Sequence, residues 1–266
     1  MSHFRSSLET RPVVCFFENM AARDSSALLL DYDGTLAPFR VDPATAVPYP
    51  GVIQRLHRIR QCKRNRLVFI SGRRAGEVNQ FLGLENVEIW GCHGMERLRT
   101  DGSLEEFALD EKTLKAIGNV ALRLREEGLG PLIEDKPVAN AVHWRGLSTE
   151  QAEAVKEKVE IVWAGLPDRD RLRILRFDGG IEICAASMNK GDVVRQIALE
   201  VGESCAIAYM GDDVTDEDAF QALKGIGLSI LVRESHRETA ADIWIHPPGE
   251  LLDFLDNWIR VCGSIA

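Results

Sequence analysis

Short apolar runs alternate with amphipathic segments at both ends of the chain. The N-terminal part has apolar runs at 27–30, 67–70 and 87–90, separated by helical patterns that begin near Gly51 and Gly76. The C-terminal part repeats this order, with helices expected over 190–201, 217–223 and 251–261 and strands over 206–210, 227–232 and 243–245. Such alternation is typical of βαβ units on a parallel sheet. We therefore expect an α/β fold in which the two ends form one Rossmann-like, doubly wound domain.

The middle of the chain has a different pattern. Two helical stripes, each followed by a pair of short β-like runs, lie at Leu114, Ile117, Ala121 and Leu124 and at Ala152, Val155 and Val159. The last pair of runs flanks Asp178–Gly179–Gly180, a tight-turn signal. The order predicts an inserted α+β domain over 104–185 built from a duplicated αββ unit. The core domain would then be 1–103 with 186–266, hinged at the seams near 101–104 and 185–187.

Composition excludes several classes of protein. The 266 residues carry a net charge of -9, which argues against a nucleic-acid partner. The one basic segment, 55–66, is interpreted as the solvated face of a helix that buries Val52, Ile53, Leu56 and Ile59. The six cysteines are widely spaced and are expected to be buried free thiols. With neither a signal-peptide pattern nor a membrane-spanning run, we expect a cytoplasmic protein without a membrane partner.

Two carboxylates follow the first apolar run. Asp31 and Asp33 lie at i and i+2, so they point the same way in extended backbone, and Gly34 allows the chain to turn. Carboxyl ends of parallel strands are where open α/β sheets bind ligands. The pair could bind a hard cation, or could divide the roles of nucleophile and acid/base.

A second acidic cluster follows the run at 206–210. Five acidic side chains fall within seven positions, namely Asp212, Asp213, Asp216, Glu217 and Asp218. The last two suit a helix N-terminus, whereas Asp212 directly follows a strand and a glycine, and a cation would relieve the repulsion. Ser71, after the run at 67–70, and Lys190, at a helix start, could counter the charge of a phosphate.

In this order, these residues resemble the four motifs of the haloacid dehalogenase superfamily. Within it the chain most resembles the trehalose-6-phosphate phosphatases, over about residues 27–245. The strings that carry the resemblance are DYDGTLAP at 31–38, SGR at 71–73, GCHGME at 91–96, EDK at 134–136, HWR at 143–145 and GDDVTDEDAF at 211–220. The inserted domain resembles the second type of cap domain in that superfamily, which closes over the active site.

The resemblance implies a Mg2+-dependent sugar-phosphate phosphatase. Asp31 would be the nucleophile that forms an aspartyl-phosphate, and Asp33 would be first the acid and then the base. Ser71 and Lys190 would steady the transferring phosphoryl group. Mg2+ would be held by Asp31, the backbone carbonyl of Asp33 and Asp212, with Asp213 and Asp216 behind these ligands.

The resemblance also implies a set of residues that contact the sugar. In the inserted domain, Glu134 and Lys136 would share one strand face, His143 and Arg145 another, and Glu182 would lie on the last strand. In the core the candidates are Gly72, Arg73, His93 and Glu96. Trehalose 6-phosphate would be the substrate, and a trehalose-phosphate synthase a functional partner.

One departure from the family pattern bears on the substrate. Where these phosphatases commonly read Glu, an aliphatic residue, Arg and Pro, the chain reads Glu182–Ile183–Cys184–Ala185, so a positive charge is missing, and Trp144 replaces a more usual Tyr. Another sugar or glycoside phosphate, such as glucosylglycerol phosphate or sucrose 6-phosphate, stays open as the substrate. A phosphomutase would use the same aspartyl-phosphate. A non-catalytic sugar-phosphate sensor is disfavoured because Asp31, Asp33, Lys190 and Asp212 are all present.

Overall fold

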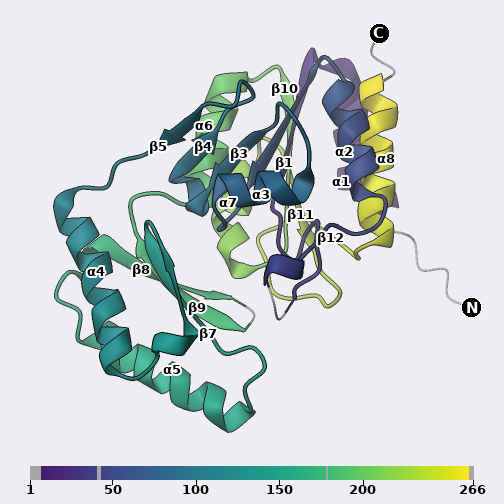
Figure 1. The fold of residues 1–266 in the computed structure, drawn as a ribbon. Coiled ribbons are helices and arrows are strands. Elements are labelled where there is room, and N and C mark those ends of the chain that lie inside the picture. Colours follow the sequence, from purple (N-terminus) through teal and green to yellow (C-terminus); the bar gives the residue numbers. More distant parts are fainter. Residues whose placement is uncertain (1–6, 41–42, 178, 264–266) are drawn as a thin grey trace, which may run out of the picture. The chain divides into compact units, whose positions relative to one another are not determined.

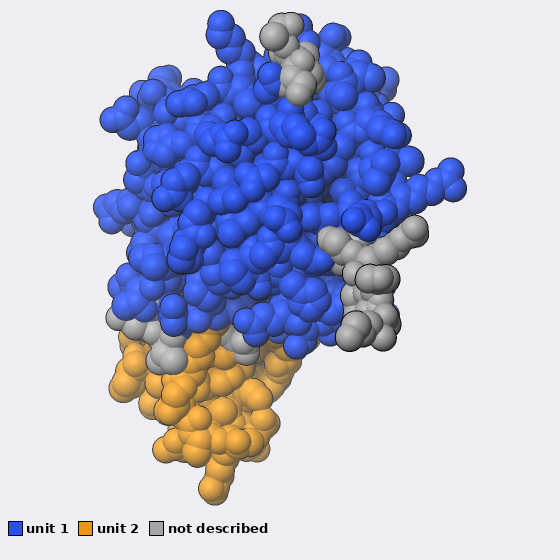
Figure 2. All heavy atoms as spheres, turned by 90° about the vertical axis from the view of Figure 1, so that its right-hand side faces the viewer, with its two compact units in different colours: residues 1–105, 190–266 blue, residues 106–189 orange. Residues whose placement is uncertain are grey.

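The computed structural model describes residues 7–40, 43–177 and 179–263, and the chain divides into two compact units (Figures 1 and 2). Unit 1 comprises residues 1–105 and 190–266, and unit 2 comprises residues 106–189. Both seams lie a few residues after the sequence-based boundaries. On the N-terminal side, strand β5 (Leu104–Glu106) still belongs to the sheet of unit 1. On the C-terminal side, the Ala186 N–H donates to the carbonyl of Arg171 within unit 2.

Unit 1 is built on an eight-stranded sheet of order β12-β11-β10-β1-β2-β3-β4-β5. The strands are β1 (Ser25–Leu30), β2 (Asn65–Ile70), β3 (Glu88–Gly91), β4 (Glu96–Leu98), β5, β10 (Cys205–Gly211), β11 (Leu228–Val232) and β12 (Ile243–Ile245). The pairs from β12 through β3 are parallel, and β4 is antiparallel to β3. The expected parallel core is therefore confirmed. Strands β4 and β5 are too short to produce a visible alternation and were not predicted.

The strand order reverses between β1 and β10. The chain moves outward from β1 through β2 to β3, and later returns to place β10 on the other side of β1. Leu30 is paired in register with Met210 of β10 and with Phe69 of β2. The residues that follow these three strands therefore meet at one edge of the sheet, at the switch point where α/β sheets bind ligands.

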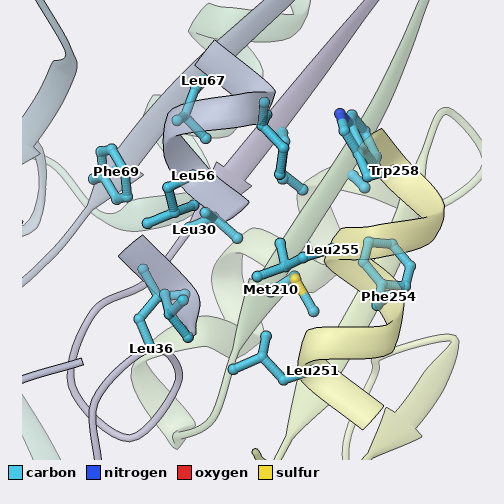
Figure 3. Close-up of a cluster of buried hydrophobic side chains, with 14 of the residues drawn as sticks. Leu30, Leu36, Leu56, Leu67, Phe69, Met210, Leu251, Phe254, Leu255 and Trp258 are labelled. Atoms are coloured by element: carbon cyan, nitrogen blue, oxygen red, sulfur yellow. The ribbon is translucent and has the colours of Figure 1, made fainter. Parts of the chain in front are cut away.

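Helices cover both faces of this sheet, as a doubly wound fold requires. One face packs against α1 (Arg11–Ala22), α2 (Val52–Gln61), α3 (Ala75–Leu82) and α8 (Gly249–Gly263). The other carries α6 (Lys190–Val201) and α7 (Glu217–Leu223), which pack on each other. Figure 3 shows part of the first layer, where Leu56 of α2 lies by Leu30 of β1 and Leu255 of α8 lies by Met210 of β10. Helix α1 was not predicted, although Val13, Phe17 and Met20 form its buried face.

Unit 2 pairs a four-stranded antiparallel sheet with two helices. Its elements are α4 (Glu111–Glu126), β6 (Ile133–Lys136), β7 (Ala139–His143), α5 (Thr149–Ala164), β8 (Leu172–Phe177) and β9 (Gly180–Ala185). The sheet order β6-β7-β9-β8 places the second hairpin beside the first. This is the expected duplicated αββ unit. Of the predicted turn, Asp178 lies outside the described residues, whereas Gly179 has a φ of +81° that favours glycine.

The buried faces of the unit 2 helices differ from the predicted stripes. In α4, Leu114 is half-exposed, and the buried side chains are Thr113, Ala116, Ile117, Val120 and Leu124. In α5, Val155 and Val159 are buried as predicted, Ala152 is only half-buried, and Val162 is buried in addition. The predicted stripe of α4 is therefore confirmed at Ile117 and Leu124 and wrong at Leu114 and Ala121. Its N-terminus is fixed by Asp110, whose side chain caps the N–H groups of Lys112 and Thr113.

The basic segment 55–66 is only partly a solvated helix face. Val52, Leu56 and Ile59 are buried as expected. Arg55, however, donates to Asp256 of α8 at 2.6 Å. Arg66 lies on β2, where it joins a buried ion-pair network.

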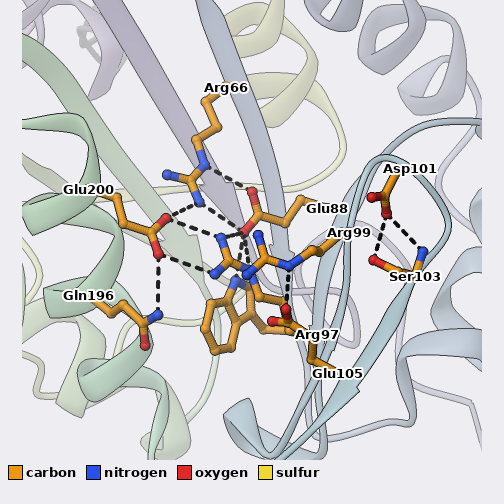
Figure 4. Close-up of polar contacts among 10 residues, drawn as sticks. Arg66, Glu88, Arg97, Arg99, Asp101, Ser103, Glu105, Gln196 and Glu200 are labelled. Atoms are coloured by element: carbon orange, nitrogen blue, oxygen red, sulfur yellow. Dashed lines mark hydrogen bonds and ion pairs between the residues drawn. The ribbon is translucent and has the colours of Figure 1, made fainter.

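That network ties β2, β3 and β4 to the last turns of α6 (Figure 4). Glu88 accepts from Arg66 Nε at 2.9 Å and from Arg97 Nε at 3.0 Å, and Glu200 of α6 accepts from both arginines at 2.6 and 3.1 Å. Burial alone would raise the pKa of Glu88, but hydrogen bonds from Arg66 and the charges of both arginines lower it. Glu88 therefore contributes stability while it is ionised.

We expect Glu88→Gln to destabilise the protein in a pH-dependent way. At pH 7 the variant should lose about 2–4 kcal/mol, because the buried Arg97 guanidinium loses one of its two carboxylate partners and keeps only Glu200. A lowered pKa in the folded state gives stability that is present above the ordinary value of 4.5 and disappears as the pH falls below it. Urea unfolding of wild type and variant at pH 7, 4.5 and 3.5 should show the difference shrink. Glu85→Gln, at an exposed position, is the matched control, and a pH-independent difference would contradict this account.

Candidate active site

Asp31 lies at the carboxyl end of β1 and is almost fully buried. Its N–H donates to the carbonyl of Met210 at 2.9 Å, which continues the β1–β10 ladder by one residue. Its Oδ1 accepts from Lys190 Nζ at 2.7 Å, and its Oδ2 accepts from Thr35 Oγ1 at 3.2 Å. Burial raises the pKa of Asp31 to about 7, in spite of the Lys190 charge. The carboxylate therefore depends on nearby cations to stay ionised.

Lys190 and Asp216 form the second part of this buried cluster. Lys190 begins α6 and also donates to Asp216 Oδ1 at 2.6 Å. Burial alone would lower the pKa of Lys190, but the charges of Asp216 and Asp31 outweigh it and raise the pKa. Lys190 is thus a fixed cation between two buried carboxylates. This confirms that residues 159 positions apart in the chain meet at one point.

Asp216 holds the loop that follows β10. Its Oδ1 also accepts from Tyr209 Oη at 2.5 Å, and its Oδ2 accepts from the N–H groups of Asp212 and Asp213 at 3.0 and 2.9 Å. Both oxygens are therefore already engaged by hydrogen bonds. Asp213 turns away to cap the N–H of Val214 at 2.8 Å. In this arrangement Asp216 orients the loop on which Asp212 lies.

Asp212 is the carboxylate best suited to a metal ion. It is almost fully buried, and its Oδ2 has no hydrogen-bond partner among the described residues. Burial raises the pKa of Asp212 well above its usual range, and Asp31 and Asp216 raise it further. Carboxylate oxygens of Asp31, Asp212 and Asp216 lie within 4.8 Å of one another. Such a set of oxygen donors fits a hard divalent cation such as Mg2+, which would stabilise the ionised forms.

Two glycines make room for this cluster. Gly34 has a φ of +82°, and a Cβ there would lie 2.2 Å from Asp212 Oδ2. A Cβ on Gly211 would lie 2.3 Å from Cγ of Asp216. Neither position can accept a side chain without moving an acidic residue. Both glycines are therefore needed for the close approach of the loops after β1 and β10, and Gly34 is also needed for the turn of the chain.

Asp33 is held by Arg73, from the loop after β2. The guanidinium donates to both oxygens of Asp33, from Nε at 2.6 Å and from Nη2 at 2.7 Å. Arg73 was predicted to bind substrate, and this structure shows it bonded to Asp33, a predicted catalytic carboxylate. Ser71, in the same loop, is buried, and its Oγ accepts from the Arg73 N–H at 3.1 Å. Ser71 follows β2 next to β1, so its place at the same sheet edge is as expected.

The other predicted residues of unit 1 pack around this loop. The ring of His93 lies where a Cβ of Gly72 would be, at 2.8 Å, so Gly72 and His93 are packed together. His93 is buried and has a φ of +57°. Glu96 is buried, and its oxygens accept from Arg74 Nε at 3.0 Å and from the Ala75 N–H at 2.9 Å. Glu96 thus caps the start of α3.

Two arginines that the sequence analysis missed balance the acidic loop. Arg233 follows β11, and its Nη1 lies 3.9 Å from Asp212 Oδ2. Arg237 donates to the carbonyl of Asp213 at 2.7 Å and also bonds the side chain of Glu217. Repulsion within the loop was expected to be relieved by a metal cation alone, whereas these two arginines supply part of the positive charge. The signal available in the sequence was a pair of arginines just after the next predicted strand.

Unit 2 presents a polar sheet face opposite its helices. Val142, Ile181 and Ile183 point into the core with α4 and α5. The residues that alternate with them share the other face, because Glu134 is opposite Ala141, and Ala141 is opposite Glu182. This polar face consists of Glu134, Lys136, His143, Arg173, Glu182 and Cys184, together with Ala139, Ala141 and the apolar Leu175 and Phe177 of β8.

The charges of the polar face are paired across strands. Lys136 Nζ lies 2.6 Å from Glu182 Oε2, and His143 Nε2 lies 2.8 Å from Glu134 Oε2. Arg145 lies beyond the end of β7, against Gly179, rather than in the row with His143. Arg173, which sequence reasoning missed, is directly opposite Cys184 in the β8–β9 pair. A cation is therefore present beside the position where the sequence analysis found one missing.

Two further expectations from the sequence concern the cysteines and the absence of a membrane-spanning segment. All six cysteines are free thiols, of which Cys15 is exposed and Cys62 half-buried, so the expectation of burial is wrong for these two. Among the described residues, every helix is too short or too polar to span a bilayer.

Comparisons with known proteins identify similar chains. The family model described as Trehalose-phosphatase matches residues 29–243. A trehalose-phosphate phosphatase of Mycobacterium tuberculosis is 28% identical over 249 residues, covering 88% of this chain and 61% of that protein. A probable trehalose-phosphate phosphatase 9 of Oryza sativa subsp. japonica is 31% identical over 282 residues, covering 93% and 74%. The chain thus spans about three fifths of the length of the mycobacterial relatives.

A solved structure has the same fold. The C-terminal domain of the Candida albicans trehalose-6-phosphate phosphatase superposes with a TM-score of 0.80 at 21% identity. The match covers 93% of this chain and 96% of that one. The α/β core and the α+β insertion are therefore features that the two chains share.

Proposed function

The chain belongs to the trehalose-phosphatase family, and from this we propose that it is a Mg2+-dependent phosphatase that hydrolyses trehalose 6-phosphate to trehalose and phosphate. The observation that carries the proposal is the buried cluster of Asp31, Lys190 and Asp212 at the switch point of the sheet, with Asp33 beside it. Phosphoryl transfer requires mainly positioning and charge neutralisation, which such a cluster supplies.

In the first step, an oxygen of Asp31 attacks the phosphorus, and the bond from phosphorus to the sugar oxygen breaks. Asp33 donates a proton to that leaving oxygen. In the second step, water attacks the aspartyl-phosphate and gives its proton to Asp33, so that phosphate leaves and Asp31 is restored. Lys190 and Ser71 hold the phosphoryl oxygens throughout. Neither step requires an oxidant or a reductant.

A divalent cation would be held by Asp31, Asp212 and the backbone carbonyl of Asp33. Bound there, Mg2+ would neutralise phosphoryl charge and orient the group for in-line attack. The orphaned oxygen of Asp212 supports this assignment. Because Asp216 already accepts hydrogen bonds on both oxygens, we assign it to orienting the loop.

Removing the metal should abolish turnover. We expect EDTA to lower phosphate release by at least about 100-fold and added Mg2+ to restore it. Without substrate, Mg2+ should raise the melting temperature of the wild-type protein, because a ligand that binds only the folded state stabilises it. Asp212→Asn should lose most of this shift, and Asp253→Asn, at an exposed position of α8, should keep it. Equal melting temperatures with and without Mg2+ would contradict the proposed metal site.

The polar face of unit 2 is proposed to bind the sugar, with Glu134, Lys136, His143 and Glu182 as hydrogen-bonding groups. The small residues Ala139 and Ala141 lie between these side chains in the strand register. Arg145, Gly72, Arg73, His93 and Glu96 were expected to join them. Of these, we retain Gly72, His93 and Arg145 in the substrate-binding proposal, and we assign Glu96 to the capping of α3.

A substrate panel tests the function. Phosphate release would be measured from trehalose 6-phosphate, glucose 6-phosphate, sucrose 6-phosphate and glucosylglycerol phosphate. A preference for trehalose 6-phosphate supports the proposal and makes Cys184–Ala185 a tolerated variation. Turnover of another member would keep the mechanism and change the substrate. Binding without turnover would favour a sensor, and formation of an isomeric sugar phosphate in place of free phosphate would favour a phosphomutase.

A further inference from the structure

Arg73 makes an unusually complete contact with Asp33. Its Nε and Nη2 donate to the two carboxylate oxygens at 2.6 and 2.7 Å, which is the fork geometry in which a guanidinium fixes both the position and the rotation of a carboxylate. A lysine would fix only one oxygen. The carboxylate of Asp33 is 29% exposed, so without such a partner it could rotate toward solvent.

Arg73 is itself held from three sides. Its side chain is only 10% exposed. The guanidinium carbon lies 5.0 Å from the ring centroid of Phe81 and 5.8 Å from that of Tyr32, and the two rings are stacked on each other. Its remaining Nη1 bonds Glu77, which lies in the first turn of α3. A group restrained by packing and by ion pairs can hold its partner within the narrow geometry that proton transfer requires.

The chain positions of these residues reinforce this assignment. Tyr32 immediately precedes Asp33, and Phe81 and Glu77 lie on α3, which follows the Arg73 loop. The guanidinium thus links the loop after β1 to the helix after β2. Ser71 in the same loop bonds the N–H of Arg73 at 3.1 Å. The contact is therefore built from residues of two motifs, the one after β1 and the one after β2.

We propose, on the basis of the function proposed above, that Arg73 is a positioning residue for Asp33 rather than a substrate-binding residue. In the first step, Asp33 donates a proton to the sugar oxygen as the bond from that oxygen to phosphorus breaks. One Arg73 N–H keeps its bond to one oxygen of Asp33 while the other oxygen carries the proton. Arg73 therefore acts on the acid step through Asp33, without touching the phosphoryl group.

This proposal predicts a dependence on the leaving group. The sugar oxygen is a poor leaving group that needs a proton, whereas the 4-nitrophenolate of 4-nitrophenyl phosphate leaves without one. The ratio kcat/KM reports only the steps up to the first irreversible one, which here is the transfer of the phosphoryl group to Asp31. In Arg73→Met we expect kcat/KM for the sugar phosphate to fall about 10- to 100-fold, and that for 4-nitrophenyl phosphate to change less than threefold.

A double-mutant cycle separates positioning from a merely structural role. Asp33→Asn should show the same selective loss, and adding Arg73→Met to it should cause little further loss, because both changes remove one function. Arg73→Lys should retain part of the activity, through a single contact. Arg58→Met, at an exposed position of α2, is the matched control. Circular dichroism and melting curves would verify that each variant is folded.

Three results would overturn the proposal. An equal loss for both substrates would indicate that Arg73 supports the site as a whole. A rise in KM for both substrates with kcat unchanged would return Arg73 to phosphate binding. Additive losses in the double variant would show that Arg73 and Asp33 act independently. Failure of the proposed function is distinguishable, because wild-type protein would then release no phosphate from trehalose 6-phosphate.

Discussion

Replacing Asp31 with asparagine should abolish phosphate release while the protein stays folded. The amide cannot form the bond to phosphorus, so we expect kcat to fall by about a thousandfold or more. The fold should tolerate the change, because the amide oxygen can still accept from Lys190 and one of three crowded carboxylates is removed. We expect the free energy of unfolding to change by no more than about 1 kcal/mol.

The measurement combines turnover, unfolding and trapping. Phosphate release and urea unfolding would be compared for wild type, Asp31→Asn and Asp253→Asn, which changes an exposed aspartate of α8. Acid quenching after mixing with radiolabelled substrate should leave label on the wild-type protein and none on Asp31→Asn. Turnover by a well-folded Asp31→Asn sample would remove Asp31 as the nucleophile.

Replacing Lys190 with methionine should remove activity and stability together. Lys190 is the cation between Asp31 and Asp216, and its side chain is only 3% exposed. Without the lysine, two buried carboxylates remain close together with no cation between them. Removing one partner of a buried ion pair lowers the free energy of unfolding by about 3–5 kcal/mol. The phosphoryl group also loses a partner, so we expect kcat to fall at least about 100-fold.

A second variant keeps this prediction informative if Lys190→Met fails to fold. Adding Asp216→Asn to Lys190→Met removes one of the two unpaired negative charges. The double variant should recover part of the lost stability, but not the activity. Urea unfolding of the two variants at pH 7 gives the comparison. Arg195→Met, an exposed position of the same helix, serves as control. Unchanged stability in Lys190→Met would contradict the role of Lys190 as the central buried cation.

Local patterns determined much of the fold. The helices α6 and α7 were predicted with their observed limits, and the parallel strands nearly so, because apolar runs and helical periodicity depend on neighbours in the chain. The order of strands and helices also fixed the doubly wound topology and the insertion. In α4, where polar and apolar residues leave two stripes possible, the pattern favoured Leu114, and packing against the sheet selected Thr113.

For the candidate site, too, the residues could be predicted from local patterns but their contacts could not. Asp31, Lys190 and Asp212 could be predicted because each follows a strand or opens a helix within a recognisable motif, and parallel strands bring such ends together. The sequence did not determine what each side chain contacts. It was the register between β8 and β9 that placed Arg173 opposite Cys184.

Arg73 is an example of a residue whose motif was recognised but whose partner was not predicted. Its motif indicated a functional residue, whereas its partner, Asp33, lies 40 positions earlier in the chain. Pairing over such a distance depends on the order of strands, on the turn after each strand and on the packing of Phe81 and Tyr32. Sequence by itself determined which residues are candidates for the chemistry and at which edge of the sheet they lie. Only the tertiary structure decided which of them hold each other, because side-chain pairing is set by three-dimensional packing rather than by spacing along the chain.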